Sequence, residues 1–313
     1  MNRPMSAENL IELVSGVRGP KVLVVEESEL AQWVKETLTP YVDRLVVSDP
    51  KRNRWIAKAD FNNDRTSAIK LAELQRGGYI KKVHHLEGAE AQLRRRFLHY
   101  ADLNDQVRRF KNKLKAIYRQ EGITATGDGV YPQEQRGSWL DRLKGSLCLR
   151  HQAERLHFLL DTVGAMKQES LSGMKREAKK GKGYELLLTI PGVGPVVACG
   201  YMALIGTPHR FSRKNKLWRY AGFGNMLHIS ADRVYADRPS KTGNRLLKWV
   251  VGQQFMGAVQ RTRKDNVFKR RYARLRREGH SAKVARRHVC RSLLSVVRAV
   301  WMKGEAYREA EIS

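Results

Sequence analysis

The stretch "KVLVVEESELAQWVKETLTPYVDRLVVSDP", residues 21–50, decides the fold class of the first part of the chain. Its ends, "KVLVVEE" and "RLVVSDP", are short apolar runs of strand length, and the apolar residues of "LAQWVKETLTPYV" between them have helical spacing. Strand, helix and strand with short connections are typical of parallel α/β structure. In such sheets, ligand-binding and catalytic residues usually lie at the carboxyl ends of the strands, and Glu26 and Glu27 lie at such an end.

Helical periodicity begins at about residue 89. A glycine-rich segment, "EGITATGDGVYPQEQRGS", interrupts it, and a second helical pattern runs from about Trp139 to Lys180. We expect two long antiparallel helices, either as a spacer or oligomerisation arm or as a simple helical hairpin within the chain. The first helix has apolar residues at steps of three or four, close to a coiled-coil seam: Leu93, Phe97, Tyr100, Leu103, Val107, Phe110, Leu114 and Ile117.

The charge of the chain points to a polyanionic partner. Sixty Lys and Arg against 31 Asp and Glu give a formal net charge of +29. Nucleic acid is the partner we expect, because phosphate neutralisation supplies affinity independent of sequence; a merely basic, ribosome-like surface is the alternative. Residues 261–291 hold thirteen Lys or Arg and two acids, with apolar residues interleaved at roughly helical spacing, which favours a basic helix against DNA or RNA.

The composition also bears on the compartment. The mean hydropathy is −0.54, and the sequence has no apolar run of membrane-spanning length and no apolar secretory core near its start. The cysteines Cys148, Cys199 and Cys290 are isolated, which argues against a zinc site or a disulfide framework. We expect a soluble cytoplasmic protein without a membrane partner, in which the cysteines are small core residues.

The motif "IPGVGPVVA", residues 190–198, has a glycine-rich turn between two apolar helices. Backbone amides at such a turn can bind a phosphate oxygen, and glycine allows the close approach and the positive φ. This arrangement predicts a helix-hairpin-helix in which Gly192 and Gly194 contact nucleic-acid backbone. The alternative is a tight Gly-Pro corner between packed helices.

A second segment, "YAGFGNMLHISADRVYADRPSKTGNRLLKW" (residues 220–249), places Ser230 near three cations, Arg233, Arg238 and Lys241. A serine that attacks a phosphodiester needs cations around the transition state and a loop that permits approach. Alone, the pattern is weak, because a serine in a basic loop is usually a turn residue.

Carboxylates cluster in "DFNNDRTSAIKLAEL", residues 60–74. Asp60 and Asp64 are four residues apart, and Asp64 and Ser67 three, so either pair would share one helix face. Together with Glu26 they could bind Mg²⁺, which prefers a few carboxylates with water and substrate phosphate. The alternative is that Asp60 or Asp64 caps a helix that begins near Thr66.

Taken together, "VLVVEES", "NNDRTSAIKLAEL", "LLLTIPGVGPVVA" and "YAGF…S…SKTGNRLLKW" resemble the insertion-sequence one-ten family of transposases, relatives of the Piv DNA invertase that act as RNA-guided bridge recombinases. The resemblance runs from about residue 8 to about residue 300. It implies α/β plus α architecture: an RNase H-like (RuvC-like) domain at residues 1–88, a helical coiled-coil arm at 89–183, and a mainly helical C-terminal transposase domain with a helix-hairpin-helix at 184–313.

The resemblance also implies roles for residues. The family binds Mg²⁺ with four acids and uses a serine nucleophile that forms a phosphoserine link to DNA. The strand-end glutamate falls on Glu26, the third acid on Asp64, the fourth position on Ser67 and the nucleophile on Ser230. No Asp precedes Glu26 as a counterpart of the first family aspartate, so we expect the earlier strands to be missing from this sequence, through a late start codon or decay of this copy. The surrounding residues would grip DNA: Gly192, Gly194, Arg233, Arg238, Lys241, Asn244 and Arg245.

The sequence thus predicts a DNA transposase or site-specific recombinase that acts through Ser230 with Mg²⁺ at Glu26 and Asp64. A guide RNA, dimers that pair into tetramers, and a bacterial or archaeal cytoplasm are implied by the resemblance alone. The first alternative is a catalytically impaired nucleic-acid-binding remnant. A weaker one is a metal-dependent nuclease of the Holliday-junction type, which would need the acids but not Ser230.

Overall fold

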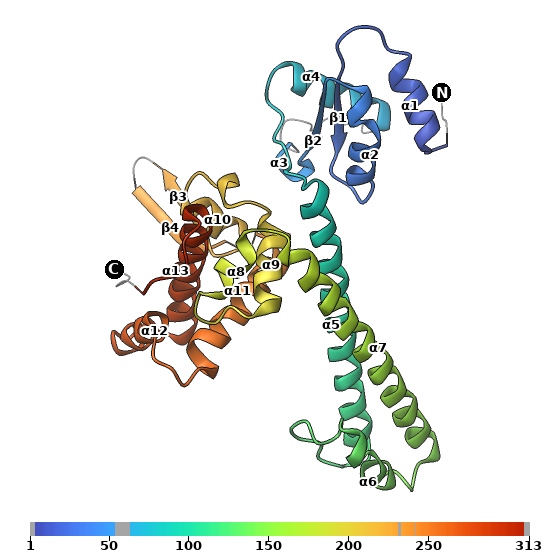
Figure 1. The fold of residues 1–313 in the computed structure, drawn as a ribbon, viewed down its shortest axis with the longest axis vertical. Coiled ribbons are helices and arrows are strands. Elements are labelled where there is room, and N and C mark those ends of the chain that lie inside the picture. The colour runs from blue at the N-terminus through green and yellow to red at the C-terminus, as the bar shows by residue number, and fades with distance from the viewer. Residues whose placement is uncertain (1–3, 54–62, 231–232, 241, 310–313) are drawn as a thin grey trace. The chain divides into compact units, whose positions relative to one another are not determined.

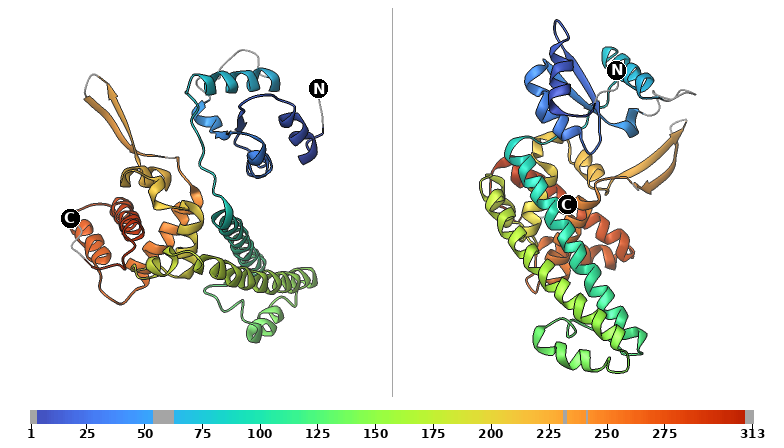
Figure 2. Two further views of the ribbon diagram at one scale, coloured as in Figure 1. Left: turned by 45° about the horizontal axis from the view of Figure 1, so that its top comes forward. Right: turned by 90° about the vertical axis from the view of Figure 1, so that its right-hand side faces the viewer.

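The computed structural model describes residues 4–53, 63–230, 233–240 and 242–309. The chain divides into two compact units, Met1–Leu86 and Glu87–Ser313 (Figures 1 and 2). Each unit has apolar clusters of its own. Among the described residues, no helix combines the length and the apolar character that crossing a membrane requires.

A parallel strand pair forms the centre of Met1–Leu86. Strands β1 (Val22–Glu26) and β2 (Arg44–Ser48) pair in register, with Glu26 opposite Ser48, and helix α2 (Ala31–Leu38) connects them. The strand, helix and strand predicted for residues 21–50 are confirmed. The chain later returns to β2 in the antiparallel direction, where Val83 N donates to Val47 O (2.8 Å). The assignment to an RNase H-like fold stays a prediction.

Helices cover both faces of this pair. Helices α1 (Ala7–Ser15) and α2 pack on one face, where Leu23 and Val25 join their cluster. Helix α4 (Asp64–Arg76) packs on the other face, where Val24 joins its cluster. The alternation of side chains along β1 explains this division. Two short elements complete the unit: the 3₁₀ turn η1 (Thr39–Tyr41) and α3 (Pro50–Asn53).

The N-cap of helix α4 is Asn63, and neither of the two carboxylates expected there, Asp60 or Asp64, takes this position. Asn63 has an extended backbone, and its side chain accepts a hydrogen bond from Thr66 N at 2.8 Å. Asp64 is the first helical residue, so the prediction that Asp64 caps a helix beginning near Thr66 is wrong. Asn63 takes the cap because an amide oxygen in the preceding position reaches the orphan amides of the first turn. Asp60 lies outside the described residues.

Two helices of 33 residues each begin the second unit and form an antiparallel arm (Figure 1). Helix α5 runs over Gly88–Gln120 and α7 over Leu147–Lys179. The second helix begins later than predicted, because Trp139 belongs to a separate short helix, α6 (Arg136–Asp141), which follows the 3₁₀ turn η2 (Gln133–Gln135).

The predicted seam of the arm largely faces the interior. Six of its eight residues are buried, whereas Val107 and Phe110 are half-buried. The far end of the arm has an apolar cluster around Tyr118, and Arg136 ties it to α7 through two hydrogen bonds to the Asp161 carboxylate (2.5 and 2.6 Å).

The rest of the unit is helical apart from one hairpin. The elements follow in the order α8 (Gly183–Leu188), α9 (Pro195–Ile205), η3 (Pro208–Arg210), α10 (Lys214–Tyr220), β3 (Asn225–Ser230), β4 (Arg233–Pro239), α11 (Arg245–Phe255), the π-helix η4 (Met256–Arg261), α12 (Val267–Arg277) and α13 (Ala282–Lys303).

One large core joins these helices to the base of the arm, since Phe97 of α5 and Met174 of α7 lie in the same cluster as α9, α11 and α13. The limits between arm and C-terminal domain stay a prediction. Cys199 and Cys290 belong to this core as expected, and burial raises the pKa of each thiol to about 12. Cys148 is exposed, so the prediction that it is a core residue is wrong.

His157 is a buried imidazole on α7. Its side chain is 3% exposed, and among the described residues neither ring nitrogen has a hydrogen-bond partner. Burial, with the nearby Arg136 guanidinium, lowers the pKa of His157 to about 4. The ring is therefore neutral in the folded protein near pH 7.

We expect the free energy of unfolding to fall as the pH is lowered from 7 towards 4. Because the folded-state pKa lies below the usual 6.5, the unfolded chain binds a proton that the folded chain does not, and stability present above pH 6.5 is lost towards pH 4. His157→Leu should remove about 1–2 kcal/mol of this pH dependence, less than the full shift because solvent screens part of it. Urea unfolding at the two pH values measures it.

The matched control is His151→Leu, because His151 lies on the same helix but is exposed. It should leave the pH dependence of unfolding as it is in the unaltered protein. The same pH dependence in His157→Leu as in the unaltered protein would contradict the prediction.

Candidate nucleic-acid interface and hairpin site

The candidate nucleophile lies on a β-hairpin that extends from the helices of its unit (Figures 1 and 2). Strands β3 and β4 are antiparallel, with Asn225 opposite Pro239 at the base and Ser230 opposite Arg233 at the far end. A register irregularity falls between His228 and Ile229.

A strand replaces the loop that was expected around Ser230. Leu227, Ile229 and Val234 are strand formers, and their local preference outweighs the small and polar residues nearby. Arg233 stands opposite Ser230 in the ladder, whereas Arg238 lies opposite Met226, close to the base. The hairpin therefore brings the backbones of Ser230 and Arg233 together and separates Arg238 from them. Lys241 lies outside the described residues.

At the base of the hairpin, the backbone segments around Gly222 and Gly243 are closely packed. A Cβ on Gly243, whose φ is 133°, would lie 2.5 Å from the backbone of Gly222, so only glycine allows the two segments to meet. Ser240 N donates to Gly224 O at 3.0 Å. Two side chains of α13, Arg287 and Arg291, also donate hydrogen bonds to this base, to Gly224 O and Phe223 O.

Asn244 is the N-cap of helix α11, which follows the hairpin. Its Oδ1 accepts from Leu247 N (2.9 Å), which caps α11, and its Nδ2 donates to Tyr220 Oη (3.3 Å). Both polar ends of the side chain are thus engaged within the protein. Arg245, the first residue of α11, is exposed and faces solvent with its charge. Of these two predicted DNA contacts, Arg245 is therefore the one whose side chain is accessible to DNA.

The glycine-rich turn between α8 and α9 uses its two glycines differently. Gly192 has φ 77°, and a Cβ there would lie 2.4 Å from Gln254 O and 2.6 Å from Ala258 N. The Gln254 side chain fixes the same turn, because it donates to Pro191 O (3.2 Å) and accepts from Tyr201 Oη (2.5 Å). Gly192 therefore packs against the end of α11.

Gly194 faces open space. It is the N-cap of α9, and a Cβ there would meet no atom within 4 Å. The amides of Val196 and Val197 in the first turn have no intrahelical acceptor, as in any helix. If this turn contacts phosphate, the open side at Gly194 is the side that can do so.

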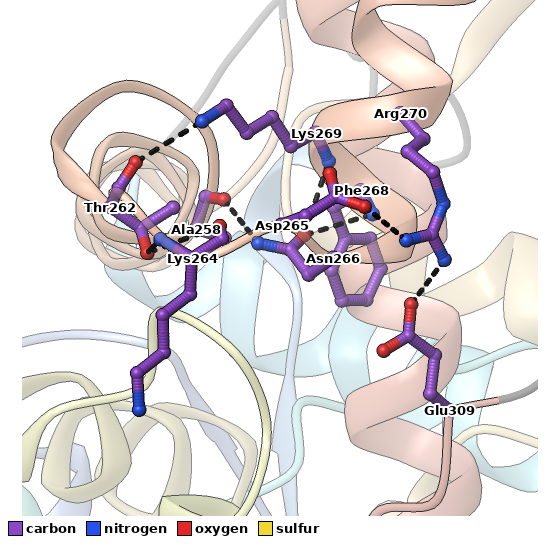
Figure 3. A network of polar contacts seen from close by, with 9 residues as sticks. All are labelled: Ala258, Thr262, Lys264, Asp265, Asn266, Phe268, Lys269, Arg270 and Glu309. Atoms are coloured by element: carbon purple, nitrogen blue, oxygen red, sulfur yellow. Dashed lines mark hydrogen bonds and ion pairs between the residues drawn. The ribbon is translucent and has the colours of Figure 1, made fainter.

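Basic residues gather on α12 and its flanks, with the apolar stripe turned inwards: Phe268 and Leu275 are buried. Figure 3 shows that part of this charge is neutralised, because Arg270 forms ion pairs with Asp265 and Glu309. In the same network Asn266 accepts from Phe268 N and Lys269 N and so caps the helix. Arg274 also pairs with Glu278 (3.6 Å), and the exposed cations of described residues 261–277 outside these ion pairs are Arg261, Arg263, Lys264, Arg276 and Arg277.

The carboxylate positions lie in the other unit. Glu26 ends β1 and Asp64 begins α4, both exposed, and α4 packs against β1. Ser67 lies on the first turn of α4, half-buried. Within the part of the chain that the structure describes, no three or more His, Cys, Asp or Glu side chains are grouped so that they could hold a metal ion.

Sequence reasoning missed a polar chain beside Glu26. His85 lies between Glu27 and Gln32: its Nε2 contacts Glu27 Oε2, and its Nδ1 lies 2.7 Å from Gln32 Oε1. Gln32 Nε2 donates to Glu36 Oε1 (2.8 Å), so its Oε1 is the atom that faces the ring. Nothing in the sequence pairs His85 with a residue 58 positions away.

The fold and charge define a basic helical protein with a projecting hairpin, a class suited to a polyanionic partner. Residues 184–273 match the model of the transposase IS116/IS110/IS902 family. The matched segment runs from α8 into α12 and contains the glycine-rich turn and the whole hairpin. It supports transposition of an insertion sequence, with DNA as the substrate. A search of curated proteins gave no match.

The two glycines of the turn make a matched pair of variants. Gly192→Ala should destabilise the fold by about 2–4 kcal/mol, because its Cβ meets backbone at 2.4 Å and its φ is positive. Gly194→Ala should lower the melting temperature far less, because its Cβ enters open space and only the weaker preference of alanine for the N-cap position acts against it. Thermal unfolding of both variants measures this difference. Equal melting temperatures would contradict the packing role of Gly192.

Proposed function

We propose that this protein is a transposase or site-specific recombinase of an insertion sequence that cleaves and rejoins DNA through Ser230. The observation that carries the proposal is the family match over residues 184–273, which includes the hairpin with Ser230 at its far end. The formal net charge of +29 supports a DNA partner, because a surface so basic gains affinity from phosphate neutralisation.

The proposed chemistry is a transesterification. The Ser230 Oγ attacks a backbone phosphorus, an Oγ–P bond forms, and the bond from phosphorus to one deoxyribose oxygen breaks. The serine proton ends on the leaving oxygen, and the reverse reaction with a new DNA end restores the serine. One ester replaces another, so no external energy source is needed. A nearby guanidinium would stabilise the charge on the transferring phosphate, and we assign that role to Arg233, whose backbone lies opposite Ser230 in the ladder.

Magnesium is part of the proposal through Glu26 and Asp64. Both carboxylates are exposed, and α4 packs against β1, which supports this assignment because Mg²⁺ is often bound through one or two carboxylates, with water and substrate phosphate as the other ligands. Ser67 would offer only a neutral oxygen to this site. When bound, the ion would stabilise negative charge on a phosphate oxygen.

The remaining parts of the proposal rest on the sequence resemblance. They are a guide RNA, dimers that pair into tetramers, and DNA contacts by Gly194, Arg233, Arg238, Lys241 and Arg245. The charge is compatible with either nucleic acid and supports both in the same way.

Ser230→Ala should abolish covalent protein–DNA adducts, because the variant lacks the oxygen that forms the phosphoserine ester. DNA affinity should stay within about twofold, since the serine hydroxyl adds little to phosphate neutralisation. Denaturing gel electrophoresis with labelled DNA measures the adduct, and a filter-binding titration measures affinity. Ser172→Ala, at an exposed serine of α7, is the control and should form adducts normally.

Three other outcomes have distinct meanings. Persistent adducts in Ser230→Ala would reject Ser230 as the nucleophile. DNA binding without cleavage by the unaltered protein would favour the binding-only remnant. Mg²⁺-dependent cleavage that Ser230→Ala does not change would favour a metal-dependent nuclease.

The carboxylates make a second test possible. Ser67→Asp adds the acid that the family pattern has at this position, so it should lower the Mg²⁺ concentration for half-maximal cleavage, by roughly tenfold for one added charged ligand. Asp64→Asn should raise that concentration. A magnesium titration of cleavage measures both. Asp128→Asn, in the exposed segment between α5 and α6, should have no effect; an unchanged magnesium requirement in all three variants would reject the site.

A further inference from the structure

The hairpin is held at its base by two arginines of α13. Arg287 Nη2 donates to Gly224 O at 2.7 Å and contacts Asn225 Oδ1. Arg291 Nε donates to Phe223 O at 2.8 Å, and its Nη2 also contacts Asn225 Oδ1. Both guanidinium groups thus converge on one amide oxygen in the first residue of β3, and each also binds a carbonyl just before that strand.

These contacts belong to a longer stripe along one face of α13. Arg287, Arg291, Ser295 and Arg298 follow one another at steps of four, four and three, which places them on the same side of the helix. Ser295 Oγ accepts from Trp218 Nε1 (3.1 Å), and Arg298 donates to Phe211 O (2.7 and 3.0 Å). The stripe therefore holds the whole segment from η3 to β3, but only its first two arginines reach the hairpin.

A small change in the direction of β3 at its base produces a larger displacement at the far end of the hairpin. From Asn225 to Ser230 the strand advances by five residues, about 17 Å at the usual rise of a strand. A tilt of about 3–4° at the base would move Ser230 by about 1 Å. Misplacement of that size can lower the rate of an enzymatic step roughly a hundredfold.

We propose that Arg287 and Arg291 are positioning residues, which fix the base of β3–β4 through Asn225 and thereby set where Ser230 stands against the DNA phosphate. This inference rests on the proposed function. The contacts are charge-assisted and half-buried. They therefore fix the direction of β3 relative to α13 as well as the distance between them.

The test uses full-length protein in which both arginines are changed to glutamine. In R287Q/R291Q the rate of adduct formation at saturating DNA should fall roughly ten- to a hundredfold, while the Kd for DNA changes less than about threefold, as expected for the loss of two positive charges among sixty. Hydrogen exchange followed by mass spectrometry should show faster exchange of the β3 and β4 amides.

Two matched variants separate positioning from general stability. R298Q removes hydrogen bonds of the same kind from the same face of α13, yet it should leave the adduct rate and the hairpin exchange unchanged. At position 225, Asn225→Asp keeps an oxygen for both arginines and should retain the adduct rate, whereas Asn225→Leu should lower it as the double variant does.

The inference is overturned if R287Q/R291Q forms adducts at the unaltered rate, or if R298Q lowers that rate equally. Adducts that fail to form with the unaltered protein would instead overturn the proposed function. In that case hydrogen exchange still tests the inference: equal exchange of the hairpin amides in the unaltered protein and in R287Q/R291Q would show that the two arginines do not fix the base of β3–β4.

Discussion

Helix α9 is the element on which Glu87–Ser313 depends, because every residue from Val197 to Ile205 is buried. A helix without an exposed face must be covered all round, and α5, α7, α8 and α11 pack against it. Gly200 permits the closest approaches, since a Cβ there would lie 2.6 Å from Val250 and 2.9 Å from Phe97. The arm and the segment that leads into the hairpin are therefore built around a common interior.

Local patterns predicted much of this architecture. Residues 21–50 gave β1, α2 and β2, and periodicity gave the seam of α5, because these signals depend only on neighbours along the chain. The same reasoning predicted that the second arm helix begins at Trp139, whereas α7 begins at Leu147. Trp139 fits the helical spacing of apolar residues, but it lies in the separate helix α6. It also offered Asp60 or Asp64 as the helix cap, whereas the cap is Asn63, which has the extended backbone that this position requires.

The candidate site was less accessible to prediction. Motif spacing singled out Ser230, but the support of its hairpin comes from Arg287 and Arg291, which lie 62 and 66 residues beyond Asn225. Contacts across such separations follow from tertiary packing and leave no periodic signal in the sequence. The same limit applies to the turn at residues 190–194. Its glycines look equivalent in the motif, and only the position of the α11 backbone shows that Gly192 packs while Gly194 is open.

The π-helical turn Met256–Arg261 restricts where the chain can change in length. A π-helix contains an extra residue relative to an α-helix. Removing one residue would rotate the rest of this turn by about 100° around its axis. This would disturb the contact in which Asn266, the cap of α12, donates to Ala258 O (2.8 Å). The connection between α5 and α7 has exposed turns, such as residues 126–128, where added residues would rotate neither arm helix. Insertions and deletions among proteins of this build should therefore collect at the end of the arm and avoid the turn.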